Sequence, residues 1–274
     1  MVQIPVEQVV AAAHALRLAG RWSLAEQVLA AAAADDPAEL AAVAMARAEV
    51  AVDSDFWRWT TSAEAAMQRA AKALADAGQE PTIALLSFDL ELLRLRQDYF
   101  TELLGPDGPR FGPEGRDLAA VDDLALRAHR LRDTAPDRGR GGSAAFCGGL
   151  VADNLRGDPE AARPLFGAAL AAGEQADDDL LAAEALRHLC AMNHDAGDRD
   201  LARRQAERSV ELRQRAGCVP LTLAQQLLVA EMTAQEGLGE PSPVAAGIRG
   251  WAAALGLGIL ESQAAALCGA PGAS

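Results

Sequence analysis

The chain has 274 residues, half of them hydrophobic, and a formal net charge of −14 at pH 7. A field of this sign repels the phosphate backbone of nucleic acids, so we expect no nucleic acid among the partners. Only 4% of the residues are aromatic and alanine is abundant, which predicts a core built by the close approach of small side chains.

The N-terminal segment and the cysteines indicate the setting in which the chain folds. The opening MVQIPVEQVV has no basic region and includes Glu7, unlike a secretory signal. No apolar run reaches the length of about 18 residues that a membrane helix needs, so we expect no membrane contact. The cysteines are far apart and lack a C-x-x-C pair, which is typical of reduced, buried thiols. We therefore expect a soluble, cytoplasmic protein.

A turn followed by a stripe of small residues recurs along the chain. Its clearest copies follow Gly20, Gly157 and Gly197, at offsets of +5, +9 and +12 residues. The residues at those offsets are Ala25, Leu29 and Ala32, then Ala162, Phe166 and Ala169, then Ala202, Ala206 and Ser209. Offsets that differ by 4 and 3 fall on one side of a helix, where small side chains let a neighbouring helix come close.

Weaker copies follow Thr61, Gly115 and Pro241, which gives six turns spaced by 41, 54, 42, 40 and 44 residues. Each unit is predicted to be a helix, a turn and a second helix, because no segment has the alternating pattern of a strand. In the fifth unit two such helices begin with acids and end at Gly197 and Gly217. We therefore predict an all-α chain of about six antiparallel helical hairpins.

Three segments interrupt this array. Residues 103–117 contain three prolines and lengthen the third turn. Residues 135–142 form a predicted Gly/Arg hinge, which divides the chain into an N-terminal part, 1–134, and a C-terminal part, 143–274. Residues 268–274 are predicted to be a frayed tail.

The stripe, with Pro37 placed 17 residues after the first turn, resembles the second helix of the tetratricopeptide repeat (TPR). The Trp, Leu-Gly and Tyr landmarks of that family's first helix are replaced in the fifth unit by Leu186, Leu189, Cys190 and Asn193. A period near 40 residues is similar to that of bacterial regulatory TPR proteins. The resemblance implies an α-α superhelix, a TPR-like solenoid that binds a protein or peptide in its concave groove.

The resemblance also assigns groove-lining positions to the first helix of each unit. In the first and fifth units these positions each supply a Glu, an Arg and a His. Together with one residue of the fourth unit, the polar positions are Glu7, His14, Arg17, Asn154, Glu184, Arg187 and His194. We expect them to form a polar site for a peptide or small ligand, and a merely hydrated concavity is the alternative.

The sequence predicts no metal site, no cofactor and no catalytic residues. His188 and His194 are six residues apart, about 240° around a helix, so they cannot share a metal. The acids at 122–123 and 177–179 are expected to cap helices, because no D-D-x-x-D spacing for magnesium follows them. Neither a G-x-S-x-G nor a phosphate-binding G-x-x-x-x-G-K-[ST] motif occurs. The leading hypothesis is a non-enzymatic regulatory or scaffolding protein.

Two other functions stay open. The stretch DSDFWRWTTS predicts either a plug between the second unit's helices or a ligand contact through Trp57 and Trp59. A small-molecule sensor would close on a metabolite through these rings or through the groove of His14 and His194. A magnesium-dependent enzyme that uses the paired acids is the third function. The last helix, 259–268, is expected to support a homodimer, since a terminal repeat without a polar outer face seeks cover.

Overall fold

The computed structural model describes residues 4–105, 108–235, 237 and 242–269. Within that part of the chain the regular structure consists of thirteen α-helices, one π-helical turn and one pair of two-residue strands. The helices are α1 (Val6–Leu18), α2 (Trp22–Ala30), α3 (Pro37–Arg58), α4 (Ala63–Asp76), α5 (Pro81–Leu103), α6 (Leu118–Asp133), α7 (Arg138–Leu150), α8 (Pro159–Gln175), α9 (Asp179–Asp195), α10 (Arg199–Arg215), α11 (Val219–Gln235), α12 (Ser242–Leu255) and α13 (Gly258–Gly269). The predicted all-α class is confirmed.

The short elements lie between these helices. The π-helical turn η1 (Val151–Leu155) directly follows α7. The strands β1 (Leu104–Gly105) and β2 (Gly108–Pro109) pair antiparallel in the long loop after α5, which the sequence predicts to be free of strands. Arg116 holds this loop, because its guanidinium donates to the carbonyl oxygens of Gly112, Glu102 and Arg110.

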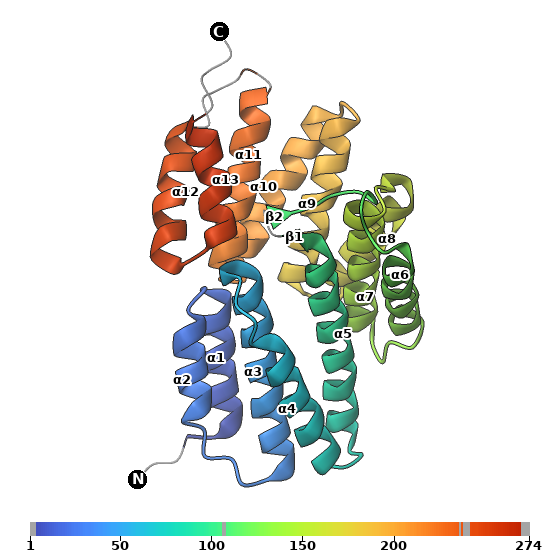
Figure 1. The fold of residues 1–274 in the computed structure, drawn as a ribbon, viewed down its shortest axis with the longest axis vertical. Helices are drawn as coiled ribbons and strands as arrows, with labels where there is room; N and C mark the ends of the chain where they lie inside the picture. The colour runs from blue at the N-terminus through green and yellow to red at the C-terminus, as the bar shows by residue number, and fades with distance from the viewer. Residues whose placement is uncertain (1–3, 106–107, 236, 238–241, 270–274) are drawn as a thin grey trace.

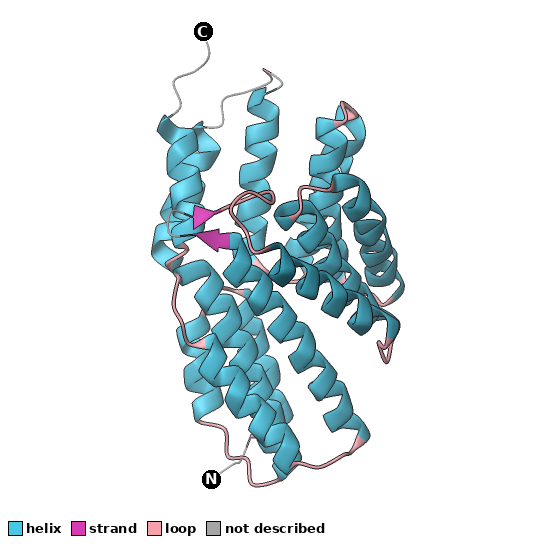
Figure 2. Cartoon of the chain, turned by 45° about the vertical axis from the view of Figure 1, so that its right-hand side comes forward, coloured by secondary structure: helices cyan, strands magenta, loops and turns pink. Residues whose placement is uncertain are grey.

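The helices pack in the order of the sequence (Figures 1 and 2). Adjacent helices form pairs, from α1 with α2 through α9 with α10, and the second helix of each of these pairs also contacts the first helix of the next pair. The first helices of successive pairs touch as well, from α1 through α3, α5 and α7 to α9. An apolar face that one pair leaves bare is therefore covered by its neighbour in sequence.

In the three clearest copies, the turns and the small-residue stripe lie where the sequence places them. Gly20, Gly157 and Gly197 end the first helices of their units at positive φ, the left-handed conformation that suits glycine. The residues at +5 of the three clearest copies are fully buried, as are Phe166 and Ala169 of the fourth unit. The sixth predicted turn, Pro241, lies outside the described residues. The expectation that small residues face a neighbouring helix is thus confirmed for these copies. It is wrong for the sixth unit, where Ala246, Gly250 and Ala253 of α12 are exposed and the neighbouring Ala245, Ile248 and Ala252 are buried instead.

Aspartates start six of these helices. In each case the residue directly before the helix is an aspartate, whose side chain accepts hydrogen bonds from backbone N–H groups of the first turn. These helices are α3, α6, α7, α8, α9 and α10. Asp178 fills this role for α9, in agreement with the expectation for residues 177–179. The same expectation is wrong for Asp122 and Asp123, which lie inside α6. There Asp122 pairs with Arg156 at 2.6 Å and Asp123 lies 3.7 Å from Arg127.

The glycines predicted to form a hinge lie in a helix instead. Residues 138–142 belong to α7, so only residues 134–137 link α6 to α7. A Cβ atom on Gly142 would lie 2.4 Å from the Cβ of Ala172. Glycine is needed here because α7 packs closely on α8, and the predicted flexible loop over 138–142 is wrong. The division into residues 1–134 and 143–274 stays a prediction.

The last helices pack against the first ones. Figure 1 shows α12 and α13 directly above α1 and α2, and α13 contacts α3. One buried cluster joins Trp22 and Trp57 to Leu227, Ile248 and Leu260. The repeat pattern predicts contacts between neighbours in sequence and gives no sign of this one. The first three helices and the last three therefore share one core cluster.

The proposed dimer helix is largely covered within the chain. Ile259, Leu260 and Ala264, which motivated self-association through 259–268, are buried against the protein's own core. A homodimer would have to use other residues of this helix. Among the described residues, no helix combines the length and apolar character needed to cross a membrane.

Candidate functional site

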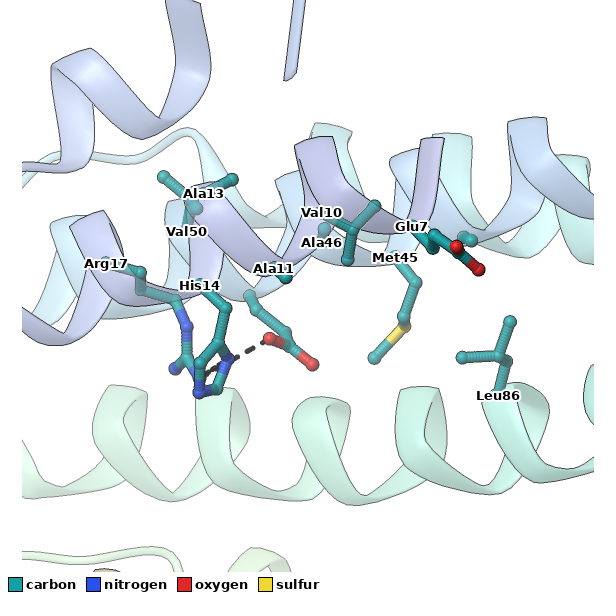
Figure 3. Close-up of a pocket in the computed structure, with 12 residues that line it drawn as sticks. Glu7, Val10, Ala11, Ala13, His14, Arg17, Met45, Ala46, Val50 and Leu86 are labelled. Carbon is teal, nitrogen blue, oxygen red and sulfur yellow. Dashed lines mark hydrogen bonds and ion pairs between the residues drawn. The ribbon is translucent and has the colours of Figure 1, made fainter. Parts of the chain in front are cut away.

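A pocket of about 430 Å³ lies between α1, α3 and α5. Figure 3 shows His14 and Arg17 at one end, Glu7 and Leu86 at the other, and Met45 between them. Three of the predicted groove residues, Glu7, His14 and Arg17, therefore lie at one pocket. We refer to it as the α1/α3/α5 pocket.

The helical register explains how this pocket forms. Residues 7, 10, 14 and 17 are spaced by 3, 4 and 3, so they share one side of α1. On α3, Ala42 and Ala46 line the same space with Met45 and Glu49, and the two alanines leave it hollow. Asp36 caps α3 and Pro37 occupies its first turn, which fixes where this helix starts.

The charged end of the pocket is built around Asp53. This buried carboxylate lies 2.7 Å from Nη1 of Arg17 and 3.0 Å from Nη2 of Arg96, which belong to α1 and α5. Burial alone would raise the pKa of the Asp53 carboxyl, but the charges of Arg96 and Arg17 outweigh it and hold that pKa below its ordinary value. Asp53 thus links three helices while it stays ionised.

His14 and Glu49 are the titratable groups that face this end of the pocket. Arg17 donates from Nη2 to Nδ1 of His14 at 3.1 Å, so that nitrogen acts as an acceptor on a neutral imidazole. Burial, and then the charge of Arg17, lower the pKa of His14. Burial raises the pKa of Glu49, whose carboxylate lies 3.5 Å from Arg17. Glu49 therefore has one long ion pair and a raised pKa, whereas Asp53 has two short ion pairs and a lowered pKa.

The other end of the pocket is apolar. Val10, Met45 and Leu86 line it, and Glu7 lies exposed at its edge. A thioether and two branched side chains can pack against an aliphatic group, whereas the Arg17 end offers hydrogen bonds and charge. The pocket therefore suits a ligand that is apolar at one end and polar at the other.

The charges continue along the first helices as far as α9. Arg96 interacts electrostatically with Asp53 on one side and with Glu184 of α9 on the other. Burial raises the pKa of Glu184, and the charge of Arg96 opposes that rise. Next to it, the half-buried Arg187 has a buried Nη1 atom that finds no hydrogen-bond partner in the part of the chain that the structure describes, and burial lowers the pKa of Arg187. Burial, and then Arg187, lower the pKa of the buried Arg213 to about 10.

The predicted groove residues lie in three places, on α1, η1 and α9. Glu184, Arg187 and His194 lie along α9, away from the α1/α3/α5 pocket. Asn154, in η1, donates from Nδ2 to the hydroxyl of Tyr99 at 2.6 Å and so is engaged within the protein. The one polar site expected from the first, fourth and fifth units is thus spread along several helices.

The two tryptophans do not form a shared surface. Trp57 is buried in the core cluster that the first and last helices share. Trp59 ends α3 at a positive φ and is 53% exposed. Phe56 stacks on Phe100 with ring centroids 4.3 Å apart. Phe56 and Trp57 thus pack between helices, as the packing alternative expects, whereas Trp59 is exposed to solvent.

Several residues of the site were not predicted from the sequence. Met45, Glu49 and Asp53 are spaced by four along α3, and that spacing was a usable signal. The groove positions of the second and third units could not be assigned, because their repeat copies are weak. Leu86 and Arg96 of α5 were missed for the same reason.

His188 is half-buried between α7 and α9, and the cysteines other than the half-buried Cys268 are buried in the core. His188 stacks on Phe166 with centroids 4.5 Å apart, and its Nδ1 lies 3.5 Å from Asp153. Burial raises the pKa of Cys147 to about 12, so its thiol stays protonated at neutral pH. Among the described residues, no three His, Cys, Asp or Glu side chains are grouped so that they could hold a metal ion.

Acidification is expected to destabilise the protein through His188. Burial lowers the pKa of folded His188, although the hydrogen bond to Asp153 opposes this effect. The unfolded residue takes up a proton as the pH falls through about 6.5, so the stability is present above that pH and is lost below it. Urea unfolding should show a smaller loss between pH 7.5 and pH 5.5, values chosen to lie about one unit either side, for His188→Gln than for the wild type.

A replacement at the surface provides the control for this measurement. His129 is exposed, with 59% of its side chain accessible. The loss of stability on acidification should be the same for His129→Gln as for the wild type. An unchanged loss in His188→Gln would show that this imidazole does not control it.

The chain matches no known protein-family model and no curated protein.

Proposed function

We propose that the chain is a TPR-like superhelix of helical hairpins that binds a protein or peptide along the face formed by its first helices, without chemistry of its own. The sequential packing of the helix pairs supports the superhelix. The observation that carries the binding role is the α1/α3/α5 pocket, in which an apolar end and a charged end lie side by side. Because the proposed activity is binding without chemistry, the role that we propose is regulatory or scaffolding.

The charges beyond the pocket favour an extended ligand. Asp53, Arg96 and Glu184 connect α3, α5 and α9 electrostatically, so polar contacts continue past the pocket itself. An extended peptide could place one apolar side chain against Met45 and Leu86 while its backbone and polar groups meet the charged helices.

A matched pair of tryptophan variants tests this proposal. Ala11 lines the pocket, whereas its exposed neighbour Ala12 does not. Peptides selected from a random library on the wild-type chain should bind Ala11→Trp about tenfold or more weakly, because the indole occupies the pocket. They should bind Ala12→Trp as they bind the wild type, with affinity measured by fluorescence polarisation. Unchanged binding to Ala11→Trp would remove the pocket from the proposal.

Small-molecule sensing is the second candidate function. The pocket volume of about 430 Å³ falls in the range usual for small ligands, and this observation favours it. A metabolite at about 100 times its dissociation constant should stabilise the protein by about 2.7 kcal/mol in a thermal-shift screen. The shift should disappear in Ala11→Trp and persist in Ala12→Trp. A metabolite screen without any shift would count against sensing.

A further inference from the structure

A second pocket, of about 240 Å³, lies between α2, α3 and α4. Its α3 residues are 47, 50, 51, 54 and 58, whereas the α1/α3/α5 pocket uses 42, 45, 46, 49 and 50. At 100° per residue, the two sets point about 130° apart around α3, with only Val50 common to both. The second pocket therefore opens on a different side of the first two hairpins and is independent of the proposed groove.

This pocket is positively charged in a strongly acidic protein. Arg47, Arg58 and Arg69 line it, against the single carboxylate of Glu26. Glu26 is already engaged, because Arg47 donates to it from Nε at 2.8 Å. The lining thus has an excess of two positive charges, whereas the whole chain has a net charge of −14.

Two of the three guanidinium groups have no counter-ion among the described residues. Arg58 lies over the ring of Trp22 at 5.0 Å from its centroid, and it donates to Ser23 Oγ at 3.2 Å and to the carbonyl oxygen of Leu255 at 3.4 Å. All three partners are neutral. Arg69 is exposed and forms no ion pair within the described chain. An anion at this position would supply the charge that both residues lack.

Backbone and hydroxyl groups add to the positive character. Helix α2 starts at Trp22, and no side chain caps its N-terminus, so free N–H groups of its first turn lie beside the pocket. Ser23 and Ser54 contribute hydroxyl groups to the lining. The start of α4 is occupied differently, because the amide of Ala63 donates to the buried Asp55 at 2.7 Å. The free helix end at this pocket is therefore that of α2.

We propose that this pocket binds the phosphate group of a small soluble molecule. The donors approach from three helices: Ser23 on α2, Arg47 and Arg58 on α3, and Arg69 on α4. A tetrahedral anion with several acceptor oxygens can meet donors from three directions, whereas a planar carboxylate offers two oxygens. The volume suits a group of that size rather than a whole drug-sized ligand.

Inorganic phosphate is the probe for the test, with binding measured by ³¹P NMR line broadening and by calorimetry at constant ionic strength. Saturable binding is expected for the wild type. Arg69→Gln should weaken it about tenfold, since it removes an exposed, unpaired charge without disturbing the core. Ser23→Asp should abolish it, because the carboxylate occupies the anion position.

The second variant separates binding from folding. An acid in the first turn of α2 favours the helix, so Ser23→Asp should unfold no more easily than the wild type. The matched control is Arg94→Gln, which removes an arginine paired with Glu91 on α5 and should bind phosphate like the wild type. The proposal is overturned if the wild type shows no saturable binding, or if either pocket variant binds phosphate as well as Arg94→Gln does.

Discussion

Asp53→Asn is expected to be among the most destabilising substitutions of a polar residue in this chain, with a loss of about 3 kcal/mol in the free energy of unfolding. Asp53 is buried and is the counter-ion shared by Arg17 and Arg96. Asparagine has nearly the same shape as aspartate, but it removes the negative charge that neutralises the guanidinium groups of Arg17 and Arg96. Arg96 keeps some contact with water, at 33% side-chain exposure, so we expect the lower end of the range for broken buried pairs.

Urea denaturation of Asp53→Asn and Asp98→Asn side by side measures this effect. Asp98 also pairs with an arginine, Arg127 at 2.6 Å, but half of its side chain is exposed. An exposed pair contributes little, so Asp98→Asn should lose at most about 1 kcal/mol. Equal losses for the two variants would mean that Asp53 does not link the first three odd-numbered helices as we describe.

Replacing either of two glycines of α8 with alanine is expected to change the free energy of unfolding, and the two changes should have opposite signs. A Cβ atom on Gly173 would lie 2.7 Å from the backbone nitrogen of Ala182 and 3.1 Å from the carbonyl oxygen of Asp178. These are backbone atoms of the α8–α9 connection and of α9, so the helices must move apart. Gly173→Ala should therefore cost about 2 kcal/mol, even though alanine favours a helix.

Gly167 is the matched position on the same helix. A Cβ atom there meets nothing within 4 Å. Gly167→Ala should stabilise the protein by about 0.5–1 kcal/mol, because it lowers the conformational entropy of the unfolded chain and favours the helix. Thermal and urea unfolding of both variants give the comparison. A stabilised Gly173→Ala would contradict the close packing of α8 on α9.

Local pattern predicted the helices and their contacts with neighbours. The stripe at +5, +9 and +12 identified buried positions such as Ala25, Ala162 and Ala202, because residues spaced by 3 and 4 lie on one side of a helix. The same pattern placed Glu7, His14 and Arg17 on one side of α1. Where glycines cluster, as in α7, composition favoured a flexible loop. The packing of Gly142 against Ala172 could not be seen without the partner helix.

Contacts between segments that are distant in the sequence could not be predicted from the repeat pattern. Nothing in the spacing of the repeats relates Trp57 to Leu260, although the two residues share the core cluster of the first and last helices. Asp53 lies 36 residues from Arg17, and a weak repeat copy gave no register for its helix. The site could be predicted only where a clear repeat fixed which side of a helix faces the neighbours.

The most direct test of the proposed binding face is hydrogen–deuterium exchange with a peptide selected on the wild-type chain. Binding should slow amide exchange in residues 7–17 of α1 and 42–50 of α3, which contain the residues of these helices that line the α1/α3/α5 pocket. The protection should be absent in Ala11→Trp at the same peptide concentration. Protection that leaves residues 7–17 unchanged and falls on the outer helices α2, α4 or α12 would contradict the account.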